Sequence, residues 1–508
     1  MTHVIPSPAY PLAHAGAGPT SRAARAVVHR LSLDRLGFAT LVLLALSLGL
    51  GDIAQVTPVD TLLLAGVHGL LPLTIGLTFL TALRKHRWPV FPRRLSLPLA
   101  AWLLITLLSA ALAPTNRAEA FAAVERPVAG ALLAWATYAL CTTLSRWLLL
   151  ARAVALGGLA IAIVGLGEAL GTPPILAWLA SLHEGQVPIG DVPRLAATLS
   201  HPNVAAILLE LSLPLLIAWM WSAARPWRWL VVSSALGTLL ALVLTFSRAG
   251  LVAAVMSLAV MARVSIARGG RRRMVMLGFV ALAVPAALLY AALTAPGLDR
   301  RLTAELTAPS SSVQPPRAVY WQVGLDMVRD NPWLGVGPDN YRWRFASYSG
   351  LAADNLGVHA HNQYIEALAD SGIIGLLTLG WLLAALLRTA IDGVRSSGAA
   401  FGRADLDDWP WRAAVLASLV AWLVHALLDD FERFWPASVA FWLIVGLIQS
   451  AQRLKSQNTA PTTTTRTSRT RIPPGLANAA PPPPPPPKLT MRRIVRRRVR
   501  PRQDAIRR

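Results

Sequence analysis

The chain has 508 residues, of which 54% are apolar and only 14% are charged. Soluble domains usually carry about 25% charged residues, so this composition excludes an ordinary cytosolic enzyme. The apolar residues also occur in runs of about 20 with scarcely a charge, which is long enough to cross a hydrocarbon core of roughly 30 Å as a helix. We therefore predict an all-α, polytopic integral membrane protein built as a helical bundle.

The formal charge of +23 has to be interpreted by where the basic residues lie. Most of them flank the apolar runs or fall in the C-terminal tail, so they indicate contact with membrane lipids, and we expect no nucleic-acid partner. The single cysteine, Cys141, excludes an intrachain disulfide and any metal site with several cysteine ligands.

The apolar runs predict about twelve membrane-spanning helices, each bounded by charges or by Pro and Gly. In chain order they cover residues 37–54, 61–83, 95–113, 127–144, 153–170, 203–221, 229–246, 249–262, 275–294, 364–387, 413–428 and 436–451. The transmembrane domain is thus predicted at 37–452, after a basic cytoplasmic segment at 1–36. No cleavage pattern follows the first run convincingly, so we expect it to act as its own uncleaved signal.

Orientation follows from the basic residues of alternate loops. One set of loops holds 18 Lys and Arg, and the opposite set holds 11 spread over more residues. Because positive charge stays in the cytoplasm, the first set is predicted to be cytoplasmic, with both termini on that side. The longest outward segment is an extracytoplasmic loop at 295–363. Within it, 317–329 is predicted to form a short surface helix that the Pro/Gly-rich stretch at 331–340 ends.

Residues 453–508 differ in composition from the rest of the chain. They contain a Thr run, seven consecutive prolines at 481–487 and an arginine cluster at 492–502. Such a segment cannot bury a core, so we predict a disordered cytoplasmic tail that is extended at the prolines and held against anionic lipid headgroups.

The most informative stretch is HAHNQYIEALADSGIIG at 359–375, where an outward loop enters a predicted span. It contains a His-Asn pair, nine residues, Gly, two residues and Gly, at His361, Asn362, Gly372 and Gly375. This pattern resembles the hallmark of the O-antigen ligase and O-antigen polymerase superfamily. We expect the two glycines to be structural and to allow close helix packing.

The resemblance extends upstream through three arginine-bearing elements in the same order. These are RLAATLSHPN with Arg194, LTFSRAG with Arg248, and the segment at 317–341 that begins with Arg317. Together the four elements cover about residues 190–390, the predicted ligase-like core, and all lie on the predicted outward side.

The resemblance implies a membrane glycosyltransferase on the outer face of the cytoplasmic membrane. Its donor would be a glycan linked through diphosphate to a polyprenol such as undecaprenol, and its acceptor a glycolipid, a glycan or a protein. A repeat-unit polymerase and a protein O-oligosaccharyltransferase of the same superfamily remain open alternatives. A flippase or transporter of lipid-linked sugars is the alternative from another class, but transporters usually repeat their halves and place charges near the midplane.

Two chemical demands assign roles to these residues. The leaving diphosphate needs a permanent positive charge, which the guanidinium groups of Arg194, Arg248 and Arg317 supply in bidentate geometry. The attacking hydroxyl needs a base that titrates near neutral pH, and His361 is the candidate. Since His361 precedes a helix and lies near arginines, we expect its neutral imidazole to be favoured.

We expect no cofactor and no metal ion at this site. Beside His361 the sequence shows no cluster of carboxylates and no His or Cys set with metal-ligand spacing, so the arginines would stabilise the leaving group.

Each principal candidate also has a purely structural alternative: His361 as a helix cap, Arg248 as the end of a hairpin between two spans, and Arg317 as an interfacial arginine that snorkels. Glu210 is costly inside a membrane, so it is expected to face a cavity and either pair with an arginine or contact sugar hydroxyls. Further candidates for substrate contact are Asn362, His201, His359 and Trp321, the last as a ring that stacks on sugars.

Overall fold

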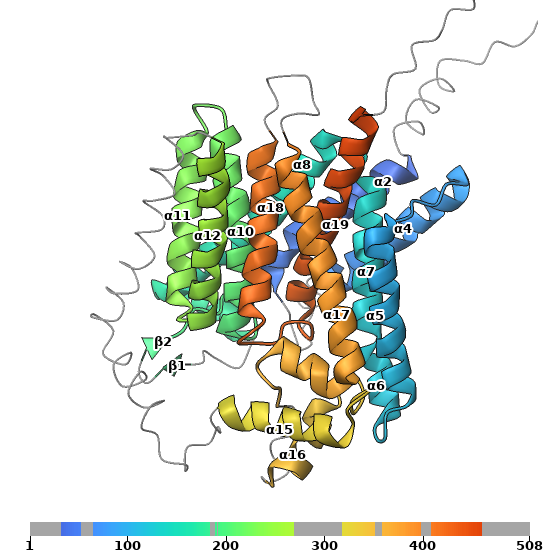
Figure 1. Ribbon diagram of the computed structural model, residues 1–508. Helices are drawn as coiled ribbons and strands as arrows, with labels where there is room; N and C mark the ends of the chain where they lie inside the picture. Colours follow the sequence, from blue (N-terminus) through green and yellow to red (C-terminus); the bar gives the residue numbers. More distant parts are fainter. Residues whose placement is uncertain are drawn as a thin grey trace, which may run out of the picture. The chain divides into compact units, whose positions relative to one another are not determined.

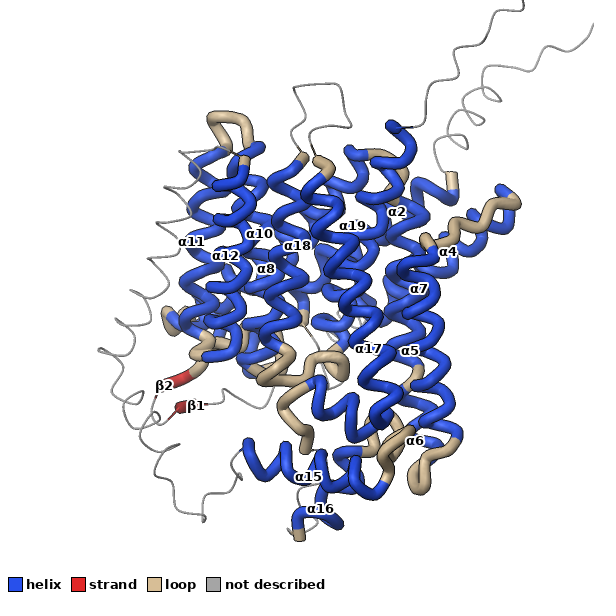
Figure 2. The backbone as a smooth tube through the Cα atoms, viewed as in Figure 1, coloured by secondary structure: helices blue, strands red, loops and turns tan. Residues whose placement is uncertain are grey.

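The computed structural model describes residues 32–51, 65–182, 188–189, 192–268, 317–350, 358–397 and 408–459. These residues are helical and turn structure apart from one antiparallel pair of two-residue strands, β1 (Pro188–Ile189) and β2 (Val192–Pro193) (Figure 2). The all-α prediction is confirmed. Contacts divide the chain into Met1–Ala460 and Pro461–Arg508, and the second unit lies outside the described residues, as does the predicted tail from residue 460 onward.

The first half of the bundle contains both short and long helices. In chain order they are α2 (Leu33–Ser47), η1 (Leu48–Leu50), η2 (Ala65–Gly69), α4 (Leu70–Lys85), α5 (Arg93–Ala111), α6 (Arg117–Ala123), α7 (Glu125–Leu140), α8 (Leu144–Ala169) and α9 (Pro173–Ala180).

The second half contains the elements that carry the sequence motifs. They are α10 (Pro202–Ser222), α11 (Arg228–Leu244), α12 (Arg248–Ala267), α15 (Arg317–Asp330), α16 (Tyr341–Ser349), α17 (Gln363–Arg395), α18 (Trp409–His425) and α19 (Trp435–Thr459). The helix predicted at 317–329 is therefore confirmed as α15, which ends at Asp330, directly before the Pro/Gly-rich turn. Its location at the membrane surface stays a prediction.

Within the described residues, eight helices are long and apolar enough to cross a membrane: Leu33–Leu50, Gly66–Lys85, Arg93–Ala111, Leu144–Ala169, Pro202–Ser222, Arg248–Ala267, Gln363–Arg395 and Trp435–Leu454. Three more predicted spans coincide with α7, α11 and α18, helices of 16 or 17 residues. The span predicted at 275–294 lies outside the described residues. The protein is thus a polytopic helical membrane protein, and the number of twelve spans stays a prediction.

Helix α10 lies at the centre of one half of the bundle. Its sequence is apolar on nearly every side, as expected for a helix buried all round. It packs against α8, α11, α12 and α18, while α17 packs against α5, and α7 against α19 (Figure 1). The core is correspondingly continuous along these helices.

The two ends of the bundle differ in character. At one end, which we call the basic end, side-chain bonds tie helix termini together: Arg146 and Lys85 both pair with Asp34, and Arg268 donates to the carbonyl of Ser397. At the opposite end, which we call the site end, α10, α12 and α17 begin, and α15 and α16 lie across the bundle there (Figure 1).

Helix α17 is interrupted at Gly372, where the backbone adopts φ +68° and ψ −172°. The turn at 331–340 docks into this break: the amide of Ile373 donates to the carbonyl of Pro332 at 2.8 Å, and that of Val336 to the carbonyl of Ala369 at 2.9 Å. A Cβ atom at Gly372 would lie 2.3 Å from the carbonyl carbon of Trp333. Gly372, the first glycine of the motif, is therefore structural, as expected. It allows a break in α17 into which a turn docks, whereas the expectation was close packing of helices.

Candidate active site

His361 lies in the loop that leads into α17 and is held in the left-handed backbone region, at φ +48°. A residue with a side chain adopts this conformation only where its surroundings enforce it, and such residues cluster at functional sites. The next residue, Asn362, caps α17, since its Oδ1 accepts from the amides of Tyr364 and Ile365 at 3.0 and 3.1 Å. Capping thus falls to Asn362, and the side chain of His361 is left 41% exposed.

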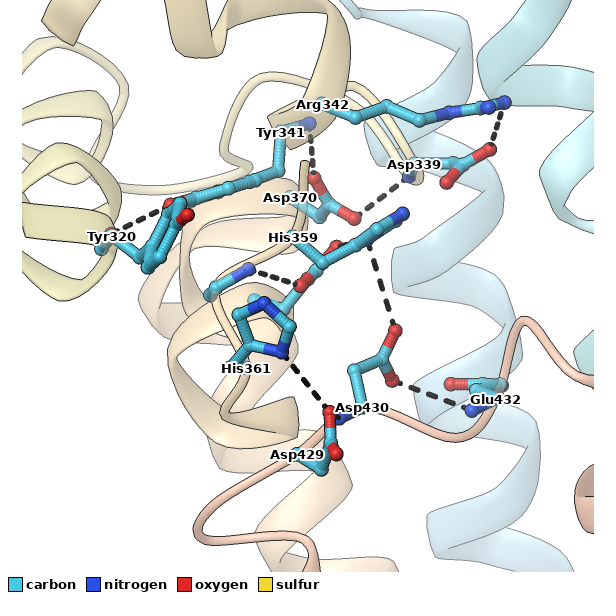
Figure 3. Close-up of polar contacts among 12 residues, drawn as sticks. Tyr320, Asp339, Tyr341, Arg342, His359, His361, Asp370, Asp429, Asp430 and Glu432 are labelled. Carbon is cyan, nitrogen blue, oxygen red and sulfur yellow. Dashed lines mark hydrogen bonds and ion pairs between the residues drawn. The ribbon is translucent and has the colours of Figure 1, made fainter. Parts of the chain in front are cut away.

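The imidazole of His361 faces Asp429, which comes from the loop after α18. His361 Nδ1 lies 3.2 Å from Asp429 Oδ1, and the ring packs edge-on against Tyr320 of α15, with centroids 5.4 Å apart (Figure 3). With its proton on Nδ1, His361 donates to Asp429 and keeps the lone pair of Nε2 as an acceptor. The arrangement is that of a base oriented by a carboxylate.

A chain of hydrogen bonds continues from Asp429 to a buried arginine. Asp429 Oδ2 accepts from Asn203 Nδ2 at 2.5 Å, and Asn203 Oδ1 accepts from Arg194 Nη2 at 2.7 Å. Arg194 is only 5% exposed. Asn203 belongs to the first turn of α10, so three separate segments of the chain meet here.

The charge state of Asp429 follows from these contacts. Burial alone would raise its pKa, but the hydrogen bonds from His361 and Asn203 and the nearby histidines hold the pKa well below its usual range. Asp429 is therefore ionised at neutral pH and can stabilise a protonated imidazole beside it.

The other two predicted arginines lie at the same end. Arg194 Nε donates to the carbonyl of Thr245 at 2.9 Å. Three residues after Thr245 comes Arg248, which is exposed and is the first residue of α12. Arg317 is the first residue of α15, one turn before Tyr320, so both residues lie on the same face of that helix. The site end thus gathers His361 and the three predicted arginines.

Three weaker candidates lie in structural surroundings, through hydrogen bonds for His201 and Glu210 and through packing for Trp321. His201 Nδ1 accepts from the amide of Asn203 at 3.1 Å and caps α10. Glu210 is fully buried, and both its carboxylate oxygens lie 3.1 Å from Nδ1 of His425, a histidine rather than the expected arginine. Trp321 packs beside the small apolar cluster under α15, and its buried indole Nε1 has no hydrogen-bond partner.

His359 belongs to a buried polar cluster next to His361. Its Nδ1 contacts the carboxylate of Glu366, whose other oxygen accepts from the amide of Ala360 at 2.9 Å. Asp430 completes the group, with Oδ2 3.9 Å from His359 Nδ1 (Figure 3). Glu366 and His359 thereby fix the backbone directly before His361.

The cluster contradicts one premise of the sequence interpretation, that no carboxylate cluster stands beside His361. Burial lowers the pKa of His359 to about 4, while burial and the neighbouring Glu366 raise that of Asp430 to about 7. Burial and Asp430 likewise raise the pKa of Glu432 to about 7. Asp430 and Glu432 were missed because they come from a loop about 70 residues further along the chain. The available signal was the pair of aspartates that ends HALLDD after an apolar stretch.

His359, Glu366 and Asp430 are also the residues that could hold a metal ion. One ligand atom from each lies within 4.8 Å of the others, and imidazole with two carboxylates is a donor set that several divalent ions accept. The expectation of a metal-independent reaction is not tested by this geometry and stays a prediction.

A polar cavity of about 90 Å³ opens next to this cluster. Trp102 of α5 forms part of its wall, and its charged lining comprises Arg126, Asp339, Glu366, Asp370, Asp430, Glu432 and Arg433. Carboxylates and guanidinium groups are suited to bonding hydroxyl groups, so the cavity has the chemistry of a sugar-binding surface.

Asp370 positions the outer elements of the site. Its two carboxylate oxygens accept from the amides of Asp339 and Tyr341, at 2.7 and 2.9 Å, and so hold the start of α16. Tyr341 in turn donates its hydroxyl to the carbonyl of Tyr320 at 2.6 Å. Through these bonds α17 fixes the ring that packs on His361.

A family model described as O-Antigen ligase matches residues 232–380, a stretch that contains Arg248, Arg317 and His361. This match supports the assignment of the chain to an O-antigen ligase-like superfamily. Members of this family are membrane glycosyltransferase-like enzymes. Asp429, the partner of His361, and Asn203, the partner of Arg194, lie outside the matched residues. Comparison with curated proteins gives no match.

Proposed function

We propose that this protein is a glycosyltransferase of the O-antigen ligase type, which transfers a polyprenyl-diphosphate-linked oligosaccharide or polysaccharide to an acceptor. The observation that carries the proposal is the hydrogen-bonded chain from His361 through Asp429 and Asn203 to Arg194. It joins a base to a permanent cation at the end of the bundle where Arg248 and Arg317 also lie.

The reaction follows from these groups. The arginines bind the donor diphosphate, and an acceptor hydroxyl attacks the anomeric carbon while His361 Nε2 takes its proton. The bond between the anomeric carbon and the diphosphate oxygen breaks, and polyprenyl diphosphate leaves with its charge neutralised by guanidinium groups. Asp429 stabilises the imidazolium that forms, and the arginines make a divalent ion unnecessary for the leaving group.

The positions of Lys and Arg at the basic end support the side of the membrane that we propose for this chemistry. Because Lys and Arg are retained in the cytoplasm, the basic end faces inward under our proposal and the site end faces outward, at the outer leaflet of the cytoplasmic membrane. Lipid-linked donors would meet the arginines from that leaflet.

The test is reconstitution of the purified full chain in liposomes with a polyprenyl-diphosphate-linked oligosaccharide. The proposal predicts that free polyprenyl diphosphate appears only when an acceptor is present, and that its release continues in chelator. Absence of release with every acceptor class, while labelled donor moves between leaflets, would instead identify a flippase.

The acceptor distinguishes the enzymes within the class. Transfer to a glycolipid core identifies a ligase, transfer to a second lipid-linked repeat identifies a polymerase, and transfer to a protein hydroxyl identifies a protein O-oligosaccharyltransferase. The same donor and the same liposomes serve all three assays.

A further inference from the structure

A second cavity lies away from the candidate active site, between α8, α10 and α11. Its volume is about 590 Å³. The lining is largely apolar and includes Leu156, Ile163, Leu166, Leu230, Val231 and Gly237. Toward the basic end, the lining also includes Arg152, Trp219, Ser222 and Trp227. The cavity is therefore an apolar groove with one charged group near its basic end.

Arg152 is the unusual residue of this groove. It stands on α8, a candidate membrane span, and its guanidinium carbon lies 5.5 and 5.6 Å from the ring centroids of Trp219 and Trp411. Its Nε is buried without a hydrogen-bond partner, and no carboxylate in the described part of the chain pairs with it. A permanently charged group in a membrane helix is costly unless an anion neutralises it.

The depth of Arg152 suits a lipid phosphate. It is eight residues beyond Leu144, the first residue of α8 at the basic end, a rise of about 12 Å. Helical side chains point toward the helix N-terminus, and a long arginine side chain reaches further in that direction, so the guanidinium approaches the headgroup level. The hydroxyls of Ser222 and Ser234 and the exposed Arg225 lie around the same end of the groove.

We propose that this groove binds an anionic phospholipid from the leaflet at the basic end, with its phosphate on Arg152 and an acyl chain along the apolar wall. The segment 275–294 of the chain itself is apolar as well, but it contains no carboxylate that could neutralise Arg152. The polyprenyl donor places its diphosphate at the site end under the proposed function. Charge complementarity thus favours the phospholipid.

The experiment is native mass spectrometry of the detergent-purified full chain, titrated with phosphatidylglycerol or phosphatidylcholine of identical acyl chains. We expect phosphatidylglycerol to bind about five- to tenfold more tightly, the scale of one basic side chain on an anionic lipid. Arg152→Gln should remove this preference and Arg152→Lys should keep most of it. Arg84→Gln, which removes an exposed charge at the basic end away from the groove, should leave it unchanged.

A second variant tests the groove without changing charge. A Cβ at Gly237 has only Leu166 Cδ1 nearby, at 3.6 Å, so Gly237→Leu is tolerated sterically while it fills the groove, and it should abolish the bound lipid. Equal binding of the two lipids by the wild-type protein, or an unchanged preference in Arg152→Gln, would overturn the proposal. A photo-crosslinker at Ser234 should capture lipid, whereas capture of residues 275–294 would overturn it as well.

Discussion

His361 is placed by three residues: Tyr320 of α15 against its ring, Asp429 from the loop after α18 on its Nδ1, and Glu366 of its own segment through the preceding backbone. The histidine itself could be predicted because it precedes an apolar run at a recognisable spacing from two glycines. Asp429 could not, because it lies 68 residues away and only the packing of α18 beside α17 brings the two together.

Asp429→Asn should reduce the turnover number for polyprenyl diphosphate release by about a hundredfold, because the imidazolium loses its counter-charge and the tautomer is no longer fixed. The KM for donor should change little, since Asp429 is not placed to touch the diphosphate. The check is steady-state kinetics in proteoliposomes across pH. Asp326→Asn on α15, which removes a carboxylate away from the histidine, is the control, and an equal loss there would contradict the assignment.

Arg248→Lys and Arg317→Lys should each raise the KM for donor and lower the rate by about tenfold although the charge is conserved, because the ammonium cannot bind two phosphate oxygens at once. Donor titrations measure both effects. Arg329→Lys, at the far end of α15 from Arg317, should be silent. Wild-type kinetics in both variants would show that these arginines only anchor the protein at the interface.

The raised pKa of Asp430 predicts a pH-dependent stability. Its folded-state pKa of about 7 lies above the usual value for an aspartate. The stability that Asp430 contributes to the folded state is therefore fully present below about pH 4 and is lost as the pH rises through 7. Asp430→Asn cannot ionise and should therefore melt at a higher temperature than the wild type at pH 8 but at nearly the same temperature at pH 4.

Thermal unfolding in detergent at the two pH values measures this difference. Glu119→Gln, which removes an exposed carboxylate on α6, is the control and should shift neither melting temperature. If the melting temperatures of Asp430→Asn and the wild type differ by the same amount at both pH values, ionisation of Asp430 does not affect the stability of the fold.

At the scale of elements, the break in α17 joins the outer helices to the bundle. Gly372 lets the turn at 331–340 reach the exposed backbone groups, and Ser109 of α5 donates to the carbonyls of Leu334 and Asp370 at 2.7 and 2.8 Å. The surface helix and the turn that ends it could be predicted from their residues. The docking of the turn into a membrane helix could not, since hydropathy alone predicts an uninterrupted span.

Gly372→Ala should destabilise the protein by at least about 1–2 kcal/mol from the left-handed backbone, with a further cost because Cβ would collide with Trp333. Activity should fall with it, because displacement of the turn at 331–340 also displaces α15, which carries Tyr320. Gly380→Ala in the same helix is the matched control: nothing lies within 4 Å of its Cβ, so stability should hold or rise slightly. Melting temperatures and release assays that are alike for the two variants would rule out the docking role.

At the scale of the whole molecule, sidedness decides whether the site can meet donors of the outer leaflet. Cys141 is fully buried, so the wild-type chain should resist membrane-impermeant thiol reagents. Ser347→Cys, exposed on α16, should be labelled in intact cells, whereas Arg225→Cys, exposed at the basic end, should be labelled only after permeabilisation. The reverse pattern would place the site in the cytoplasm.

The membrane class and the position of most spans could be predicted from composition and apolar runs, because burial in lipid constrains the sequence strongly. The pairing of distant loops at the site end depends on helix packing that local sequence does not encode. Glu210 illustrates this, since its cost in the membrane was evident but its partner, His425 on α18, was not.

The most direct measurement of the central claim is the rate at which His361→Ala releases polyprenyl diphosphate from a lipid-linked oligosaccharide, compared with wild-type protein in the same liposomes. The account predicts a fall of at least about a hundredfold with donor still bound, because the acceptor hydroxyl loses its base. Release at the wild-type rate would contradict it.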